Sequence, residues 1–190
     1  MSHGKQDTRA ALRARQGSGA RYDADDAPHS DLLLARRATA YFARKLNDLS
    51  DADLYSPSQR EGWSRAHVVA SVAYDARRLA LRLELLSPET CGLSPEILDD
   101  LPALALAATL PPRALRHLFE HATKHLDVVW RDLPGPGWAN TLELDNRGEA
   151  SIRDLPFRRA VTLWRHSLLL ADGIPEKDVP EAIRPVLESA

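Results

Sequence analysis

The sequence has little that would support disulfide bonds, a membrane span or a large net charge. Its single cysteine, Cys91, cannot form an intramolecular disulfide, which favours a reducing compartment. No apolar run approaches the roughly 18 residues that a membrane-spanning helix needs, and the first residues contain no apolar stretch typical of a signal peptide. We therefore expect a cytoplasmic protein that does not enter a membrane.

The charges of the chain are nearly balanced. It has 25 Lys and Arg residues against 27 Asp and Glu residues, which gives a formal net charge of -2. This balance gives no overall electrostatic reason to expect nucleic acid as a partner, although a local basic patch stays open. Hydrophobic residues make up 44% of the 190 residues, which is enough for the core of one domain.

Apolar residues recur at helical spacing in four long segments. Residues 1–29 lack such a pattern, so we expect a mobile tail there and one domain at 30–190. Each segment of the domain has caps or prolines at its ends. The expected helices run from Ser30 or Asp31 to residue 48, from Ser64 to Leu86, from Pro111 to about Leu133, and from Asp154 to about Ala171.

The connections between these segments are unequal in length. Ser50 can cap a short turn, and Pro102 interrupts an apolar segment that starts with a cap at Ser94. A small hairpin around 142–148 can precede the last helix, although its strand pattern is short. Four amphipathic helices with one long crossover predict an all-α, antiparallel four-helix bundle.

Three histidines, His117, His121 and His125, follow one another at four-residue steps on the third long helix. This spacing can present two imidazoles to one zinc ion. On a helical wheel, however, they point away from the apolar face, and no cysteine or carboxylate nearby in sequence completes a ligand set. We expect a histidine ladder on the surface and no metal.

The second long helix carries a polar stripe made of His67, Ser71, Asp75 and Arg78 beside its apolar face. Such a stripe holds side chains about 6 Å apart at Cβ and resembles nucleophile-and-base chemistry. The chain has no Gly-x-Ser-x-Gly elbow, no phosphate-binding glycine loop and no dinucleotide fingerprint. These absences argue against a serine hydrolase and against nucleotide-dependent chemistry.

The start of this helix, from Glu61 to Ala76, reads EGWSRAHVVASVAYDA. Its Gly-Trp-Ser-Arg-x-His pattern resembles the N-terminal domain of mycothiol-dependent maleylpyruvate isomerases, in the DinB-like superfamily. The similarity continues at 120–131 and more loosely at 155–173, and it covers most of residues 30–188. The resemblance implies a DinB-like four-helix bundle with a pit at one end.

The resemblance also implies a divalent metal in this pit, held in the family by two histidines and a glutamate. The first ligand position corresponds here to Ser71, and the favoured register puts Val161 and Arg165 at the other two. A register shifted by one residue gives Ala160 and Trp164 instead. Valine cannot coordinate, arginine stays cationic and serine is a poor zinc ligand, so we expect no metal.

An arginine in place of the metal suggests a fixed positive charge in the pit. Arg165 can bind a substrate carboxylate or stabilise a developing anion, or it can simply pair with Asp75. We expect Ser71, Asp75 and Arg165 to line one cavity with His67 and Trp63 near its rim, and His166 to be exposed. Arg165, Ser71, Asp75 and His67 are the candidate catalytic residues, and Trp63, Arg65, Tyr74 and Trp164 are the candidate substrate-binding residues.

Two functions from different classes follow. The first is a metal-independent transferase or isomerase that uses mycothiol as co-substrate and acts on a small, partly apolar substrate or its mycothiol conjugate, in specialised metabolism. The second is a non-catalytic small-molecule-binding or assembly module with a decayed metal site. The retained polar stripe favours the enzyme. A homodimer stays open as the form in which the chain assembles.

Overall fold

The computed structural model describes residues 22–86, 94–144, 148–170 and 174–188, and within them it contains the four expected long helices. The helices are α2 (His29–Asn47), α3 (Arg65–Leu85), α5 (Pro112–Asp132) and α6 (Leu155–Leu170). The expected bounds agree with these to within two residues, because prolines and the cap at Ser64 define several of the ends. Most of the expected tail and the expected end of the last helix, at about Ala171, lie outside the described residues.

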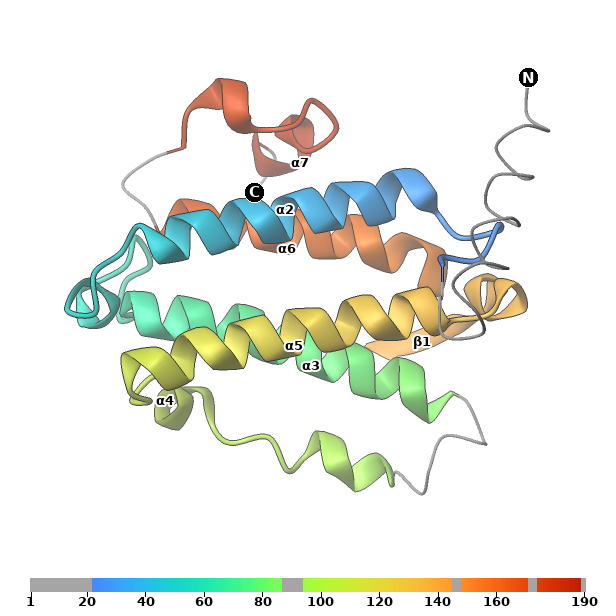
Figure 1. Ribbon diagram of the computed structural model, residues 1–190, viewed down its shortest axis with the longest axis horizontal. Coiled ribbons are helices and arrows are strands. Elements are labelled where there is room, and N and C mark those ends of the chain that lie inside the picture. Colours follow the sequence, from blue (N-terminus) through green and yellow to red (C-terminus); the bar gives the residue numbers. More distant parts are fainter. Residues whose placement is uncertain (1–21, 87–93, 145–147, 171–173, 189–190) are drawn as a thin grey trace, which may run out of the picture.

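The four helices form a two-layered bundle. Figure 1 shows α2 lying over α6 and α5 lying over α3, while α3 and α6 are neighbours. The helices α2 and α6 run in one direction and α3 and α5 in the other, because a long connection returns the chain to the end where α3 began (Figure 1). This arrangement confirms the predicted helix bundle. No described helix has the length and apolar character that crossing a membrane requires.

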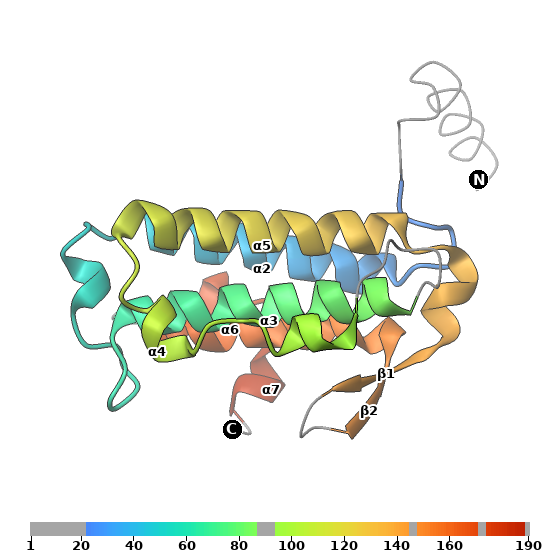
Figure 2. The same cartoon turned by 90° about the horizontal axis from the view of Figure 1, so that it is seen from below.

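Short elements connect the long helices. The connection between α3 and α5 contains η2 and α4, and the hairpin of β1 and β2 projects at one end of the bundle (Figure 2). The hairpin is confirmed: its strands pair in antiparallel register, with Thr141 opposite Ser151. The short elements are η1 (Asp53–Tyr55), η2 (Pro95–Leu98), α4 (Leu104–Ala107), η3 (Gly135–Ala139), β1 (Thr141–Leu144), β2 (Gly148–Ser151), η5 (Ile152–Asp154), η6 (Glu176–Asp178) and α7 (Arg184–Glu188).

The core follows the helical spacing of apolar residues. On α5, the buried side chains come three or four residues apart and form one face. They are Leu115, Phe119, Ala122, Leu126 and Trp130. The described part of the expected tail also joins the core, since Ala27 is buried and Asp23 forms an ion pair with Arg36 of α2.

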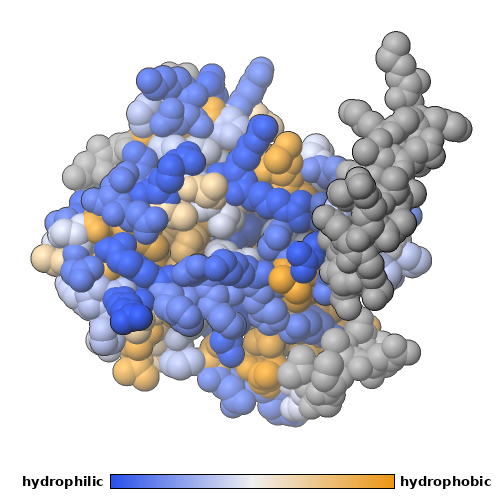
Figure 3. Space-filling view, viewed as in Figure 1, coloured by the Kyte–Doolittle hydropathy of each residue, from blue (hydrophilic) through white to orange (hydrophobic). Residues whose placement is uncertain are grey.

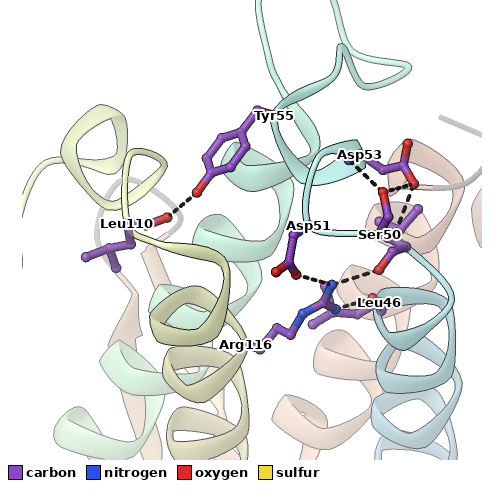
Figure 4. Close-up of polar contacts among 8 residues, drawn as sticks. Leu46, Ser50, Asp51, Asp53, Tyr55, Leu110 and Arg116 are labelled. Atoms are coloured by element: carbon purple, nitrogen blue, oxygen red, sulfur yellow. Dashed lines mark hydrogen bonds and ion pairs between the residues drawn. The ribbon is translucent and has the colours of Figure 1, made fainter.

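Arg116 of α5 forms hydrogen bonds and an ion pair with the segment that leads from α2 toward α3 (Figure 4). Its guanidinium donates to the carbonyl oxygens of Leu46 and Leu49 at the end of α2 and lies 3.4 Å from a carboxylate oxygen of Asp51. A cation at the C-terminal end of a helix stabilises the carbonyl groups that have no hydrogen-bond partner inside the helix. The following turn is capped as expected, because the hydroxyl oxygen of Ser50 accepts from the backbone N–H of Asp53. The same hydroxyl donates to the carboxylate of Asp53.

We predict that Arg116→Met lowers the free energy of unfolding by about 1–3 kcal/mol, because the carbonyl groups of Leu46 and Leu49 lose a charged donor. The exposed Arg113, one turn earlier on α5, provides the matched control as Arg113→Met. Urea denaturation followed by circular dichroism measures both changes. Equal stability of the two variants would contradict the role assigned to Arg116.

Candidate functional site

A small polar cavity lies between α3 and α6, at the level of the hairpin. Its volume is about 210 Å³. Ser71 and Asp75 reach it from α3, and Arg159 and Thr162 reach it from α6. The expectation that Ser71 and Asp75 line one cavity is therefore confirmed, and the i, i+4 spacing on α3 explains why they share a face.

Arg159 is the buried charge of this site. It is only 2% exposed, and its Nη1 donates to a carboxylate oxygen of Asp75 at 2.7 Å and to the carbonyl oxygen of Val72 at 2.9 Å. Burial lowers the pKa of Arg159, and the negative charge of Asp75 opposes this change. An arginine still keeps its charge in a protein, so Asp75 supplies the counter-charge that burial demands.

Ser71 meets His166 of α6, with 3.3 Å between the hydroxyl oxygen and Nε2. The other ring nitrogen, Nδ1, lies 2.8 Å from the carbonyl oxygen of Thr162. Because a carbonyl oxygen only accepts, Nδ1 carries the proton, and Nε2 accepts from the hydroxyl of Ser71. Burial lowers the pKa of His166, so its ring is neutral at pH 7 and Nε2 can take a proton.

The predicted place of Arg165 was wrong. Arg165 is exposed and its Nη2 donates to the carbonyl oxygen of Val186 in α7, at 3.0 Å. The expected exposure of His166 was wrong too, since this residue is half-buried and faces Ser71. A helical wheel of α6 that assumes a single apolar arc places both residues wrongly, because α6 packs on both α2 and α3 and therefore buries a wider face.

The register expected for the last helix is corrected by one residue. The residues that face Ser71 and Asp75 are Thr162 and His166, four apart on α6, and not Val161 and Arg165. His166, and not Arg165, is thus the residue of the last helix that meets Ser71. Arg159, not Arg165, is the arginine that pairs with Asp75.

The residues of the pit do not fit a divalent metal. His166 is the one nitrogen ligand there, Ser71 and Thr162 contribute alcohols, and Asp75 is engaged with the buried guanidinium. Within the described residues, no group of three His, Cys, Asp or Glu side chains is placed to hold an ion. The positive charge of Arg159, which lies beside Asp75, would also repel a metal cation in the pit.

His67 and Trp63 lie at the start of α3. The Nδ1 atom of His67 lies 2.8 Å from the hydroxyl of Ser64, and His67 and Ser64 form a capping box. The ring of Trp63 contacts the ring of His67. The guanidinium carbon of Arg60 lies over the Trp63 ring, 3.9 Å from its centroid. His67 therefore has a structural role that explains its place in the sequence signature.

The other candidate substrate-binding residues do not line the cavity. Tyr74 and Trp164 are buried, and Trp164 packs on Tyr41 of α2 with 4.4 Å between the ring centroids. Arg65 is half-buried, and its backbone N–H donates to the carbonyl oxygen of Ser56. These three side chains pack in the bundle around the cavity but do not line it.

The histidine ladder lies on the outer face of α5, as expected for His117 and His121, which are exposed with their rings 6.0 Å apart. His125 is half-buried instead, and its Nε2 lies 2.9 Å from a carboxylate oxygen of Glu84 in α3. The ladder thus helps to join two helices.

Sequence reasoning missed Arg159, Thr162 and His166. The spacing of Thr162 and His166 was a usable signal, because polar residues four apart on an otherwise apolar helix can face a polar stripe opposite. Arg159 extends this polar line by one further turn. The cavity wall also includes Arg78, Arg82 and Arg158, and all three are cationic.

The fold and the site define a class of protein: a four-helix bundle with a polar pit between two neighbouring antiparallel helices. The sequence profile of the mycothiol maleylpyruvate isomerase N-terminal domain matches residues 35–171, and the chain belongs to this family. Curated proteins show no significant match to the chain.

Two solved structures are similar over most of the chain. The crystal structure of the mycothiol-dependent maleylpyruvate isomerase has 32% sequence identity and a TM-score of 0.72. A histidine-to-alanine mutant of that isomerase has 31% identity and the same TM-score. Each match covers 84% of this chain and 67% of the other.

The neutral state of His166 predicts how stability depends on pH. Its pKa is lower in the folded than in the unfolded protein, so the unfolded state binds the proton more readily. The free energy of unfolding should therefore fall as pH drops below about 6.5, the ordinary histidine pKa. Denaturation at pH 7.5 and pH 5 should show a smaller loss for His166→Gln than for the parent. His117→Gln, at an exposed position, should keep the full loss, and the same loss in both variants would refute the assignment.

Proposed function

We propose that the protein is a mycothiol-dependent isomerase or transferase whose chemistry takes place in the cavity between α3 and α6 without a metal ion. Family membership and similarity to the isomerase support the use of mycothiol. The observation that carries the metal-free part is the contact of Ser71 with a neutral His166, beside the Asp75 and Arg159 pair.

These residues can support thiol chemistry. A neutral His166 accepts the proton of the thiol, and the thiolate adds to a double bond conjugated with a carbonyl group. The electron pair moves onto the carbonyl oxygen as an enolate, which the nearby arginines stabilise. Rotation about the new single bond and expulsion of the thiolate give the isomer, and His166 returns its proton to the sulfur. No oxidant or reductant is needed.

The wall of the cavity suggests the substrate class. Four arginines and one carboxylate line it, and Asp75 already neutralises Arg159. Arg78 and Arg158 add further positive charge, which favours an anionic substrate. The apolar side chains of Leu144 and Leu155 line the same space, so a small and partly apolar anion fits.

The second candidate is a non-catalytic small-molecule-binding or assembly module. It is supported by Ser71, which stands at a position where the family resemblance implies a metal ligand. A binding module and an enzyme differ in one measurable respect, because only the enzyme turns over a bound substrate.

We predict that the purified protein binds mycothiol in calorimetry and, with mycothiol, isomerises maleylpyruvate used as a probe, at a rate that chelators do not change. His166→Gln should lower kcat at least about 100-fold, because the proton acceptor is gone. His121→Gln, on the exposed ladder, provides the matched control and should keep the parent rate.

Each other outcome has a defined meaning. Mycothiol binding without turnover would favour the binding module, and no binding would refute the use of mycothiol. Turnover that requires added zinc would refute the metal-free chemistry while leaving the co-substrate in place.

A further inference from the structure

A second cavity lies on the opposite face of the bundle, at the seam between α2 and α5. The two helices pack mainly on α6 and α3, not on each other. Contacts across the seam include the ion pair of Arg36 with Asp127 at 2.6 Å and the ring contact of Phe42 with Phe119 at 5.0 Å. The cavity has a volume of about 460 Å³, and Figure 3 views this face and shows it hollowed between the two helices.

Two residues that line this cavity each have a buried side-chain donor without a hydrogen-bond partner in the part of the chain that the structure describes. The donors are Nη2 of Arg159 and Nε1 of Trp130, whose residues are 2% and 3% exposed. Arg159 lines both cavities. Buried donors are usually paired, and a fully buried cation with an open donor favours an anionic acceptor.

The rest of the lining combines apolar surface with charges that are already paired. Leu126, Val128 and Trp130 provide the apolar part. Lys124 is paired with Glu120, Arg131 with Asp132, and Asp127 with Arg36, so the donors of Arg159 and Trp130 that lack a partner among the described residues are the groups that call for an acceptor. The volume falls within the range of about 300–1,000 Å³ that is typical of small-molecule sites.

From these observations we infer that the α2/α5 cavity binds a small carboxylic acid with an apolar body. The carboxylate accepts from Nη2 of Arg159 and Nε1 of Trp130, and the body packs on Leu126 and the indole ring. Through Nη1, the same guanidinium holds Asp75 in the first cavity. An acid bound here therefore touches the residue that shapes the other site. This inference does not depend on the proposed thiol chemistry.

Benzoate is a suitable probe, and benzamide is its neutral counterpart of the same shape. The chain has four tryptophans, so the indole N–H signals in a nitrogen-15 correlation spectrum can be assigned by substitution. We expect benzoate to shift the Trp130 indole signal in a saturable manner. Benzamide should bind at least about tenfold more weakly, because it lacks the negative charge that attracts the guanidinium of Arg159.

Trp130→Phe keeps an aromatic ring and removes the indole donor, so benzoate affinity should fall by about threefold or more. Trp138→Phe is the matched control, since Trp138 is also buried, its Nε1 also lacks a partner among the described residues, and it does not line the cavity. This control should leave benzoate affinity unchanged.

A third variant, Thr123→Phe, fills the cavity from α5 and should abolish binding while circular dichroism shows an intact bundle. It decides the question if Trp130→Phe does not fold. The inference is overturned if benzamide binds as tightly as benzoate, if benzoate shifts Ser71 and Thr162 but not Trp130, or if Thr123→Phe binds as the parent does.

Discussion

The ion pair between Arg159 and Asp75 is the constraint on which the site depends. A guanidinium buried in the middle of a helix bundle is costly unless it is paired and hydrogen-bonded, and Asp75 and the carbonyl of Val72 meet this need. Because both acceptors lie on α3 and the donor lies on α6, the pair fixes how the two helices are aligned. In that alignment Ser71 falls opposite His166.

This alignment gives the pit its chemistry. A neutral imidazole with a fixed tautomer meets the hydroxyl of Ser71, and Ser71 lines a small cavity together with four arginines. The same arginine also borders the larger cavity between α2 and α5. One buried cation thus connects two spaces on opposite faces of the bundle, so a change at Arg159 affects both.

The fold could be predicted well from sequence because its signals are local. Caps such as Ser64, the paired prolines before α5 and helical periodicity fix where each helix begins and ends. Half of the site could be predicted in the same way, since Ser71 and Asp75 stand four apart on a helix with one clear polar stripe. Their partners could not, because α6 is buried on two sides and its wheel has no single centre. Tertiary packing on α2 and α3 decided that His166 faces inward and Arg165 faces outward.

The most direct test of the account is a double-mutant cycle on Arg159 and Asp75, measured as free energies of unfolding. We expect Asp75→Leu, which strands the buried guanidinium, to cost about 3–5 kcal/mol, and Arg159→Met to cost less, because Asp75 is partly exposed. The double variant Arg159→Met with Asp75→Leu should recover most of the larger loss, because no buried charge remains. Losses that simply add in the double variant would contradict the claim that this pair organises the site.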